Sequence, residues 1–172
     1  STLSYANRVL ALLLGLGATA ISRATLPVFS AAQAQDGQAV KALALRWAAI
    51  MFGLGVVALA VMWAIAPWVV RLLFQRGAFT PSDTQAVTQI LRLALWQLPF
   101  YFSGLVFVAA LAAQRGHARI ALSGALNLVI KLPIALALVH LYQLEGLVVS
   151  TVVMYALAAV LLYVLVTTHQ RT

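Results

Sequence analysis

Residues 47–70 read WAAIMFGLGVVALAVMWAIAPWVV, a run without a single charged side chain. The hydrocarbon core of a bilayer is about 30 Å thick and an α-helix rises about 1.5 Å per residue, so about 20 apolar residues make one crossing. The run is long enough for that, and it predicts a transmembrane helix.

Four other stretches of the chain have the same character. Hydrophobic residues make up 64% of the 172 residues, and the mean hydropathy of +1.01 is above that of a soluble domain. Backbone groups in lipid must be satisfied internally, and no stretch alternates in the manner of a membrane barrel strand. The predicted fold is therefore all-α, a polytopic membrane helix bundle. Its five transmembrane helices are expected at residues 3–26, 47–70, 93–114, 120–141 and 146–168.

The ends of the chain lead to two expectations. Ser1 precedes a full-length apolar helix, without the basic segment, short apolar core and cleavage site of a signal peptide. Because the chain begins without Met and almost inside a helix, we expect it to be a fragment of a longer protein, with residues 1–172 forming one transmembrane domain. The absence of cysteine excludes disulfides and thiolate metal sites.

The positive charge is spread between the predicted helices. The chain has eleven Lys and Arg against three Asp and Glu, a net charge of +8. No basic patch with interleaved aromatic residues is present, so we expect no nucleic-acid partner. The positive-inside rule explains the basic connections better and places Ser1 outside and Thr172 inside. The predicted inner side carries Arg23, Lys41, Arg46, Arg115, Arg119 and Arg171, and the outer side Arg8, Arg71, Arg76 and Arg92.

Proline and turn residues predict where the helices end. Pro27 follows the first span and bends the chain or is tolerated near its end. A polar connection at residues 30–41 is expected next, and the second helix rises from Ala42 and stops within residues 67–70. A short basic connection at residues 114–119 joins two helices in a tight hairpin. Glu145 and Gly146 mark the last turn.

The connection at residues 69–84 has the strongest local signal. Residues 72–74, LLF, with flanking arginines suit a turn at the membrane interface. Gly77 is expected to end this turn in the left-handed conformation. Thr80 is placed to cap the next helix, with Pro81 at its first position and Asp83 near the positive end of the helix dipole.

Helix one carries a polar stripe along one side. At 100° per residue, the stripe lies within about 60° of one line, opposite Leu10, Leu13, Leu14 and Ile21. In lipid, a small and polar stripe is expected to turn toward other helices or a water-filled cavity. The stripe consists of Ser4, Arg8, Ala11, Gly15, Thr19, Ser22 and Thr25.

Arg8 and Arg23 lie about 22 Å apart along helix one and about 60° apart around it. Two interpretations are open. Both guanidinium groups point into one cavity from opposite ends, or each reaches out to the nearer membrane interface. Arg8 continues the polar stripe, which favours the cavity.

Lys131 lies close to the middle of a predicted span, where a lysine costs about 2.5 to 3.5 kcal/mol on insertion scales. Ser123, Asn127 and Lys131 follow at four-residue steps and form one polar ridge, and Pro133 frees a backbone carbonyl nearby. Lys131 either lines a substrate path as a cation, or it stays neutral or is satisfied by Asn127 and the freed carbonyl as a packing element.

The pattern of an enzyme is missing from the sequence. Asp36, Asp83 and Glu145 all lie in predicted connections, far apart in sequence, so no acid pair is indicated. The three histidines lack metal-ligand spacing, and no glycine-rich phosphate loop is present. We therefore expect no catalytic residue, no metal and no cofactor.

Two motifs resemble a known family. Tyr5-Ala6-Asn7-Arg8 opens the first apolar helix, which ends in Leu26-Pro27, and residues 74–80 read FQRGAFT, followed by Asp83-Thr84. These residues resemble the MurJ/MviN lipid II flippase family of the MOP exporter superfamily, in which a Phe-x-Arg-Gly-x-Phe-Thr run is typical between two spans. The resemblance covers the whole chain but only part of a family member, namely helices eight to twelve of the second of two lobes.

The resemblance implies a function. Members of the family move an undecaprenyl-pyrophosphate-linked precursor of peptidoglycan, a cell-wall polymer, across the bacterial inner membrane by alternating access. Arg8 matches a cavity arginine that binds the pyrophosphate, and a guanidinium suits the geometry of phosphate. The resemblance thus implies Arg8 as a substrate-binding residue, and from their own positions in the predicted helices we expect Arg23, Asn127 and Lys131 to bind the substrate as well. The implied partners are membrane lipids, the lipid-linked glycan and a missing first lobe of the same transporter.

Departures from the family pattern leave alternatives open. Ala11 stands where the family commonly has Gln or Glu, and Lys131 where it more often has a neutral polar residue. A relative that flips a different lipid-linked glycan is one alternative. Others are a cation-coupled exporter of small amphipathic drugs, which would be expected to hold a membrane-embedded acid, and a bundle that transports nothing.

Overall fold

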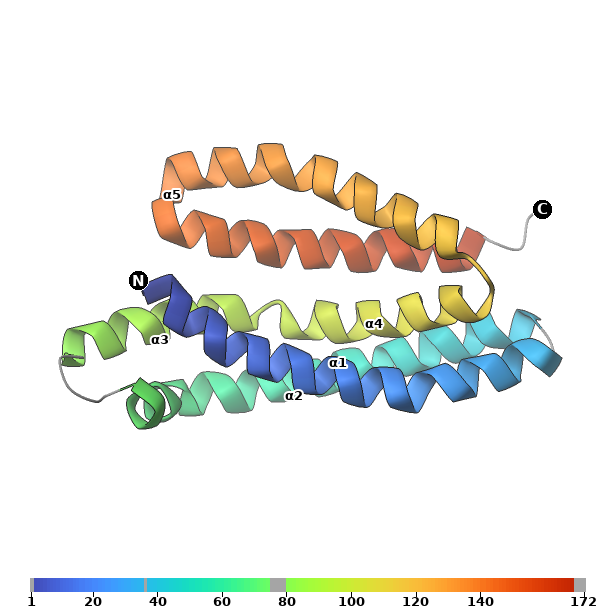
Figure 1. The fold of residues 1–172 in the computed structure, drawn as a ribbon, viewed down its shortest axis with the longest axis horizontal. Coiled ribbons are helices and arrows are strands. Elements are labelled where there is room, and N and C mark those ends of the chain that lie inside the picture. The colour runs from blue at the N-terminus through green and yellow to red at the C-terminus, as the bar shows by residue number, and fades with distance from the viewer. Residues whose placement is uncertain (1, 36, 75–79, 169–172) are drawn as a thin grey trace.

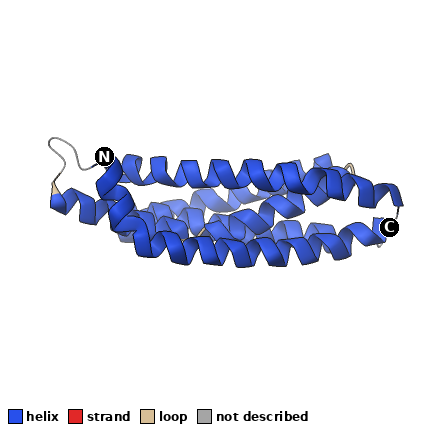
Figure 2. Ribbon diagram, turned by 90° about the horizontal axis from the view of Figure 1, so that it is seen from below, coloured by secondary structure: helices blue, strands red, loops and turns tan. Residues whose placement is uncertain are grey.

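The computed structural model describes residues 2–35, 37–74 and 80–168, and the described chain is helical apart from short turns. The helices run mostly along the long axis of one elongated bundle (Figures 1 and 2). The helices are α1 (Thr2–Gln35), α2 (Gly37–Phe74), α3 (Pro81–Leu95), α4 (Leu98–Ala113) and α5 (His117–Thr168).

Helix α5 reverses direction at Gln143, whose φ of 52° and ψ of −124° are not helical. Its two arms, residues 117–142 and 144–168, lie side by side, and the second arm is the one next to α4 (Figure 1). Gly146 makes this reversal possible, because a Cβ atom there would overlap the carbonyl oxygen of Leu138 on the first arm. The predicted turn at Glu145 and Gly146 is thus placed slightly late.

Four described helices are long and apolar enough to cross a membrane: Leu3–Ala34, Ala39–Phe74, Pro81–Ala113 and His117–Thr168. The prediction of an all-α, multi-pass membrane protein is confirmed. The count differs from the predicted five, because the two arms of α5 on either side of Gln143 are counted as one segment, His117–Thr168.

Prolines do not end the first two helices. Pro27 and Pro67 lie inside α1 and α2. The predicted end of helix one near Leu26 and the polar connection at residues 30–41 are therefore wrong, since α1 continues to Gln35 and α2 begins at Gly37. A proline removes one N–H but leaves the rest of the hydrogen-bond ladder intact, so an apolar helix continues beyond it.

The stretch predicted as one helix from Pro81 to residue 114 is broken at Trp96 and Gln97, which separate α3 from α4. The backbone N–H of Trp96 donates to Leu93 O at 3.3 Å and that of Gln97 to Ala94 O at 3.2 Å, bonds that tighten the last turn of α3. Pro99, at the start of α4, has no N–H to continue the regular ladder.

The predicted start of the third helix is confirmed. Thr80 is the N-cap of α3, Pro81 is its first residue, and Thr80 and Asp83 form a capping box. The backbone N–H of Thr80 donates to Asp83 Oδ2 at 2.9 Å, and the N–H of Asp83 donates to Thr80 Oγ1 at 3.3 Å. The predicted left-handed Gly77 lies outside the described residues, and residues 72–74 continue α2 rather than forming a turn.

The short connection predicted at residues 114–119 is confirmed as well. It spans Gln114 to Gly116, with Arg115 at φ 56° and the N–H of Gly116 donating to Leu111 O at 2.8 Å. This hydrogen bond closes the end of α4 as in a Schellman motif.

Helix α4 is central to the packing and contacts α1, α2 and α5. Gly55 allows α2 to approach α4 closely, because a Cβ there would clash with the backbone of Pro99. Gly17 does the same for α1 against the ring of Phe102. The buried residues form two clusters, one around Leu91, Leu95 and Leu98 and one around Phe29, Val106 and Leu111.

Candidate functional site

The polar stripe of α1 faces away from the described bundle. Its members from Ser4 to Thr19 are exposed, whereas Leu10 and Ile21, on the opposite side, are only 7% exposed and belong to the two core clusters. Of the two predicted surroundings, other helices or a water-filled cavity, the described helices cover little of the stripe: Ala11 lines a pocket between them, and only Thr25, at its far end, is buried. The leucine side packs inward because it has the larger apolar surface to bury.

Arg8 and Arg23 are both exposed on this outward side of α1. The guanidinium carbon of Arg8 lies 6.0 Å from the ring centroid of Tyr5, one turn earlier, so the cation rests near an aromatic face. The two arginines lie toward opposite ends of the exposed side of α1, which also carries the exposed Leu12 and Leu16.

Lys131 lines a pocket of about 410 Å³, called the Lys131 pocket below, between α1, the α3–α4 junction and both arms of α5. Arg8 is not among the residues that line it. The polar lining residues are Asn7, Gln97, Lys131, Thr151 and Tyr155, and the apolar ones are Leu3, Leu10, Ala11, Leu14, Ala94, Leu147 and Val148.

The described residues that line the Lys131 pocket carry positive charge and no negative charge. Its only formal charge comes from the half-buried Lys131, and no carboxylate is among the described residues that line it. Asp83 and Glu145 are exposed and lie elsewhere. An ammonium group in a wall of leucine and alanine side chains is costly unless water or an anion accompanies it.

The polar side chains that precede Lys131 on its helix form no hydrogen bond with its ammonium group in the described part of the chain. The Ser123 hydroxyl donates to the Ile120 carbonyl at 2.8 Å, so it is occupied within its own turn. Asn127 Oδ1 is buried and accepts no hydrogen bond from the described residues. Asn127 is thus an unused acceptor one turn from Lys131, and neither it nor the carbonyl freed by Pro133 forms a hydrogen bond with Lys131 in the described part of the chain.

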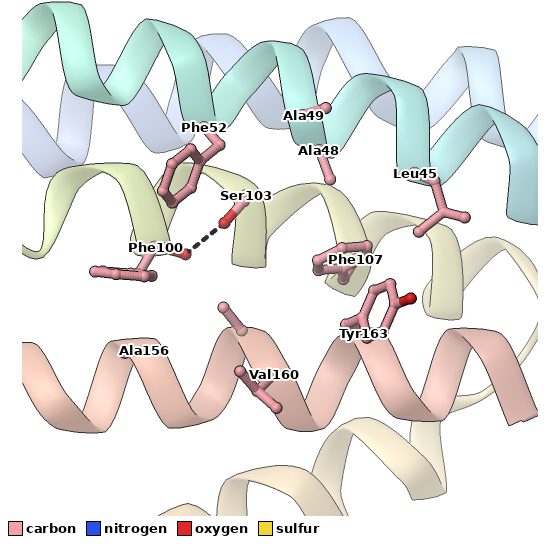
Figure 3. Close-up of a pocket in the computed structure, with 11 residues that line it drawn as sticks. Leu45, Ala48, Ala49, Phe52, Phe100, Ser103, Phe107, Ala156, Val160 and Tyr163 are labelled. Atoms are coloured by element: carbon pink, nitrogen blue, oxygen red, sulfur yellow. Dashed lines mark hydrogen bonds between the residues drawn. The ribbon is translucent and has the colours of Figure 1, made fainter.

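A second hollow, of about 300 Å³, lies between α2, α4 and the second arm of α5 (Figure 3). Its walls are mostly aromatic and aliphatic, with the Phe52 and Phe100 ring centroids 5.6 Å apart. The Ser103 hydroxyl on α4 donates to the Phe100 carbonyl at 3.1 Å. This hollow can hold an apolar group but contains no charged residue.

Sequence reasoning identified Lys131 but missed the residues that surround it. In the sequence Asn7 stands out only as part of the Tyr5-Ala6-Asn7-Arg8 motif, and tyrosines such as Tyr155 are frequent in membrane helices for packing reasons. Gln97 is 2% exposed and interrupts an otherwise apolar run. A buried amide within a predicted span was the one signal that could have marked it.

Comparison with known proteins gives a consistent result. The family model of the lipid II flippase MurJ matches residues 1–172. Proteins of two Helicobacter pylori strains, J99 and 26695, each described as a probable lipid II flippase MurJ, are 34% identical to this chain over 172 residues. These matches cover 96% of the chain but 35% of each relative.

The fold has a counterpart among solved structures. A lipid II flippase MurJ in an inward closed conformation matches with a TM-score of 0.81 at 18% identity, over 96% of this chain and 36% of that one. The helices therefore take the arrangement of part of that structure. With the family model matched from end to end and the membrane helices in place, the chain belongs to the lipid II flippase MurJ family.

Proposed function

We propose that this chain is part of the second lobe of a transporter, not an enzyme, that moves a polyprenyl-pyrophosphate-linked saccharide such as lipid II across the bacterial inner membrane by alternating access. The observation that carries the proposal is the outward-facing polar stripe of α1 with Arg8 on it. A missing first lobe of the same protein would complete the cavity that this stripe faces.

The stripe supports a cavity for an energetic reason. Hydroxyl groups and a guanidinium directed at acyl chains are expensive, whereas the same groups in a water-filled space are not. Thr19 already satisfies its hydroxyl on the Gly15 carbonyl at 2.8 Å. Arg8 has a planar fork of donors and forms no hydrogen bond with the residues that the structure describes, so these donors are available to a phosphate.

The other predicted contacts are distributed over two surfaces. Arg23 shares the exposed side of α1 with Arg8 and is suited to the inner end of the same cavity. Lys131, with Asn127 one turn away, offers a second cationic position inside the lobe. We assign all four residues to the path of an anionic substrate.

We infer that the chain crosses the membrane five times, with the start of α1 outside and the end of α5 inside. The two arms of α5 count as separate crossings in this topology, since each has about 25 residues and spans about 38 Å. The unequal distribution of Lys and Arg between the two ends supports the orientation.

The test is transport by the full-length protein of which this chain is proposed to be part. Flipping of the lipid-linked precursor is measured in vesicles for Arg8→Ala and Arg8→Lys. We expect Arg8→Ala to lower flipping by about tenfold or more, because a charge-assisted hydrogen bond is worth about 1.5 to 3 kcal/mol. Arg46→Ala removes an exposed cation from α2 and serves as the control. Unchanged flipping by Arg8→Ala contradicts the proposal.

A second candidate keeps the mechanism and changes the cargo. The cationic Lys131 and the small Ala11, both lining one pocket, favour a different lipid-linked glycan. Competition between lipid II and other polyprenyl-linked glycans in the same vesicles distinguishes the two. Against a cation-coupled drug exporter, the described acids Asp83 and Glu145 lie at the ends of helices or arms.

A further inference from the structure

We propose that the Lys131 pocket binds a lipid phosphate. The Lys131 ammonium contacts the phosphate, and the lipid chain passes Tyr155 into an apolar hollow between α4 and the second arm of α5. This inference rests on the pocket and does not require that the bound lipid is the one that is flipped.

The head-group end of the site is built from donors. Lys131 supplies three N–H groups, the amides of Asn7 and Gln97 supply NH₂ groups, and Tyr155 supplies a hydroxyl. The Thr151 hydroxyl already donates to the Leu147 carbonyl at 3.0 Å, so Thr151 is not counted among these donors. No carboxylate is among the described lining residues to neutralise the ammonium. Three uncharged donor side chains beside one cation are complementary to an anion with several acceptor oxygens, which is the chemistry of a phosphate.

The chain end of the site begins at Tyr155. This residue also lines another hollow, of about 140 Å³, whose other lining residues are apolar apart from Tyr101. The phenol thus stands between a polar and an apolar space, and its ring is packed edge-on against Tyr101, with centroids 5.3 Å apart. The hollow is lined by Phe100, Tyr101, Gly104, Leu105, Val108, Tyr155, Ala158, Ala159 and Leu162.

The two spaces follow one face of one helix. Leu147, Thr151, Tyr155 and Ala159 recur at four-residue steps along the second arm of α5 and line one space or the other. From Leu147 to Leu162 this face extends about 22 Å, most of the thickness of a bilayer core of about 30 Å. An elongated molecule with an anionic head and an apolar chain matches that shape.

The size and lining of the pocket argue against a small inorganic ion. A volume of about 410 Å³ is in the range of pockets for organic ligands, and Leu3, Leu10 and Leu14 form much of its wall. A free phosphate would leave these leucines against water. The chain of a lipid covers them and gains the free energy of their burial.

Gly104 offers a way to block the chain end without disturbing the fold. A Cβ atom at Gly104 meets nothing within 4 Å, so a leucine there extends into the hollow. Gly53 on α2 has the same open space and does not line either part of the site. Gly104→Leu and Gly53→Leu are therefore a matched pair.

The experiment measures lipid binding by native mass spectrometry on the delipidated full-length protein. The probes are phosphatidylglycerol, phosphatidylcholine with the same acyl chains, undecaprenyl phosphate and inorganic phosphate. We expect an anionic lipid to bind about tenfold more tightly than phosphatidylcholine. Lys131→Met should abolish that preference, whereas Lys131→Arg and Arg46→Met should keep it. Gly104→Leu should weaken binding of every lipid, and Gly53→Leu of none.

The outcomes separate the possibilities. Preferential binding of phosphatidylglycerol identifies a bilayer lipid, and preferential binding of undecaprenyl phosphate identifies a carrier lipid; both support the proposal. An unchanged preference in Lys131→Met, or lipid binding that Gly104→Leu does not weaken, overturns it. The proposal is also overturned if inorganic phosphate displaces the lipid from Gly104→Leu as effectively as from the unaltered protein. Unchanged flipping in Arg8→Ala contradicts only the transport proposal and leaves lipid binding at Lys131 intact, so the two proposals can fail separately.

Discussion

Arg92 on α3 holds Trp63 on α2 through two contacts. Its Nε donates a hydrogen bond of 3.1 Å to the Trp63 carbonyl, and its guanidinium carbon lies 4.1 Å from the centre of the indole ring. Pro67 stands four residues after Trp63 and has no N–H, so that carbonyl lacks its helical donor. Arg92 replaces the missing donor from another helix, and the proline is tolerated inside α2.

Substitution of Arg92 tests whether its side chain supplies the hydrogen-bond donor that Pro67 lacks. Arg92→Met should lower the free energy of unfolding by about 1 to 3 kcal/mol, because it leaves a carbonyl unsatisfied and removes a cation–π contact. The measurement is thermal or denaturant unfolding in detergent. Arg71→Met, at an exposed arginine of α2, is the control. Equal stability of the two variants would show that the contact contributes nothing.

The approach of α2 to α4 depends on Gly55. Gly55→Ala should destabilise the bundle by about 1 to 3 kcal/mol, because its Cβ would meet the Pro99 backbone, which has no room to move. Gly53→Ala, two residues away and facing open space, should be neutral or slightly stabilising. Parallel melting curves of the two variants make the comparison, and a stable Gly55→Ala would refute the predicted clash.

The contribution of the Thr80 N-cap to the stability of α3 should be measurable. Thr80→Ala removes the hydroxyl that accepts from the Asp83 N–H, at an expected cost of about 1 kcal/mol. Thr80→Ser keeps the oxygen and should retain most of the stability. Hydrogen exchange of the first turn of α3 reports the local effect; equal protection in both variants would argue against the cap.

Water access to the α1 stripe separates a cavity from a lipid-facing surface. The chain contains no cysteine, so single cysteines can be placed without removing others. Thr19→Cys, in the full-length protein, should react with a membrane-impermeant thiol reagent. Val57→Cys, at a 58% exposed apolar position of α2, should not. An unreactive Thr19→Cys in every conformation would place the stripe in lipid and remove the main support for the cavity.

Local signals in the sequence succeeded at some helix ends and misled at others. The Thr80-Pro81-Asp83 cap was predicted correctly, because a capping box involves only neighbouring residues. Pro27 was read as the end of a helix and lies within one. Whether an internal proline breaks a helix depends on what its freed carbonyl meets, and for Pro67 that partner is 29 residues from Trp63 along the chain.

The candidate site was predictable only in part. Lys131 stood out because a cation in an apolar span is expensive wherever the helix packs. Its pocket was not predictable, because Asn7, Gln97 and Tyr155 come from three other segments. The sequence leaves open whether the α1 stripe meets other helices or a water-filled cavity, since the periodicity of a helix separates two faces without saying which one the neighbouring helices cover.

The amino-acid sequence alone determined that this protein is a bundle of membrane helices, because the transfer of apolar side chains into lipid adds up along each segment and needs no distant partner. Tertiary structure decided that the leucine side of α1 is buried and its arginine side uncovered, and that Lys131 shares a pocket with Tyr155. Those outcomes depend on contacts between residues far apart in the chain, whose joint burial no single helix specifies.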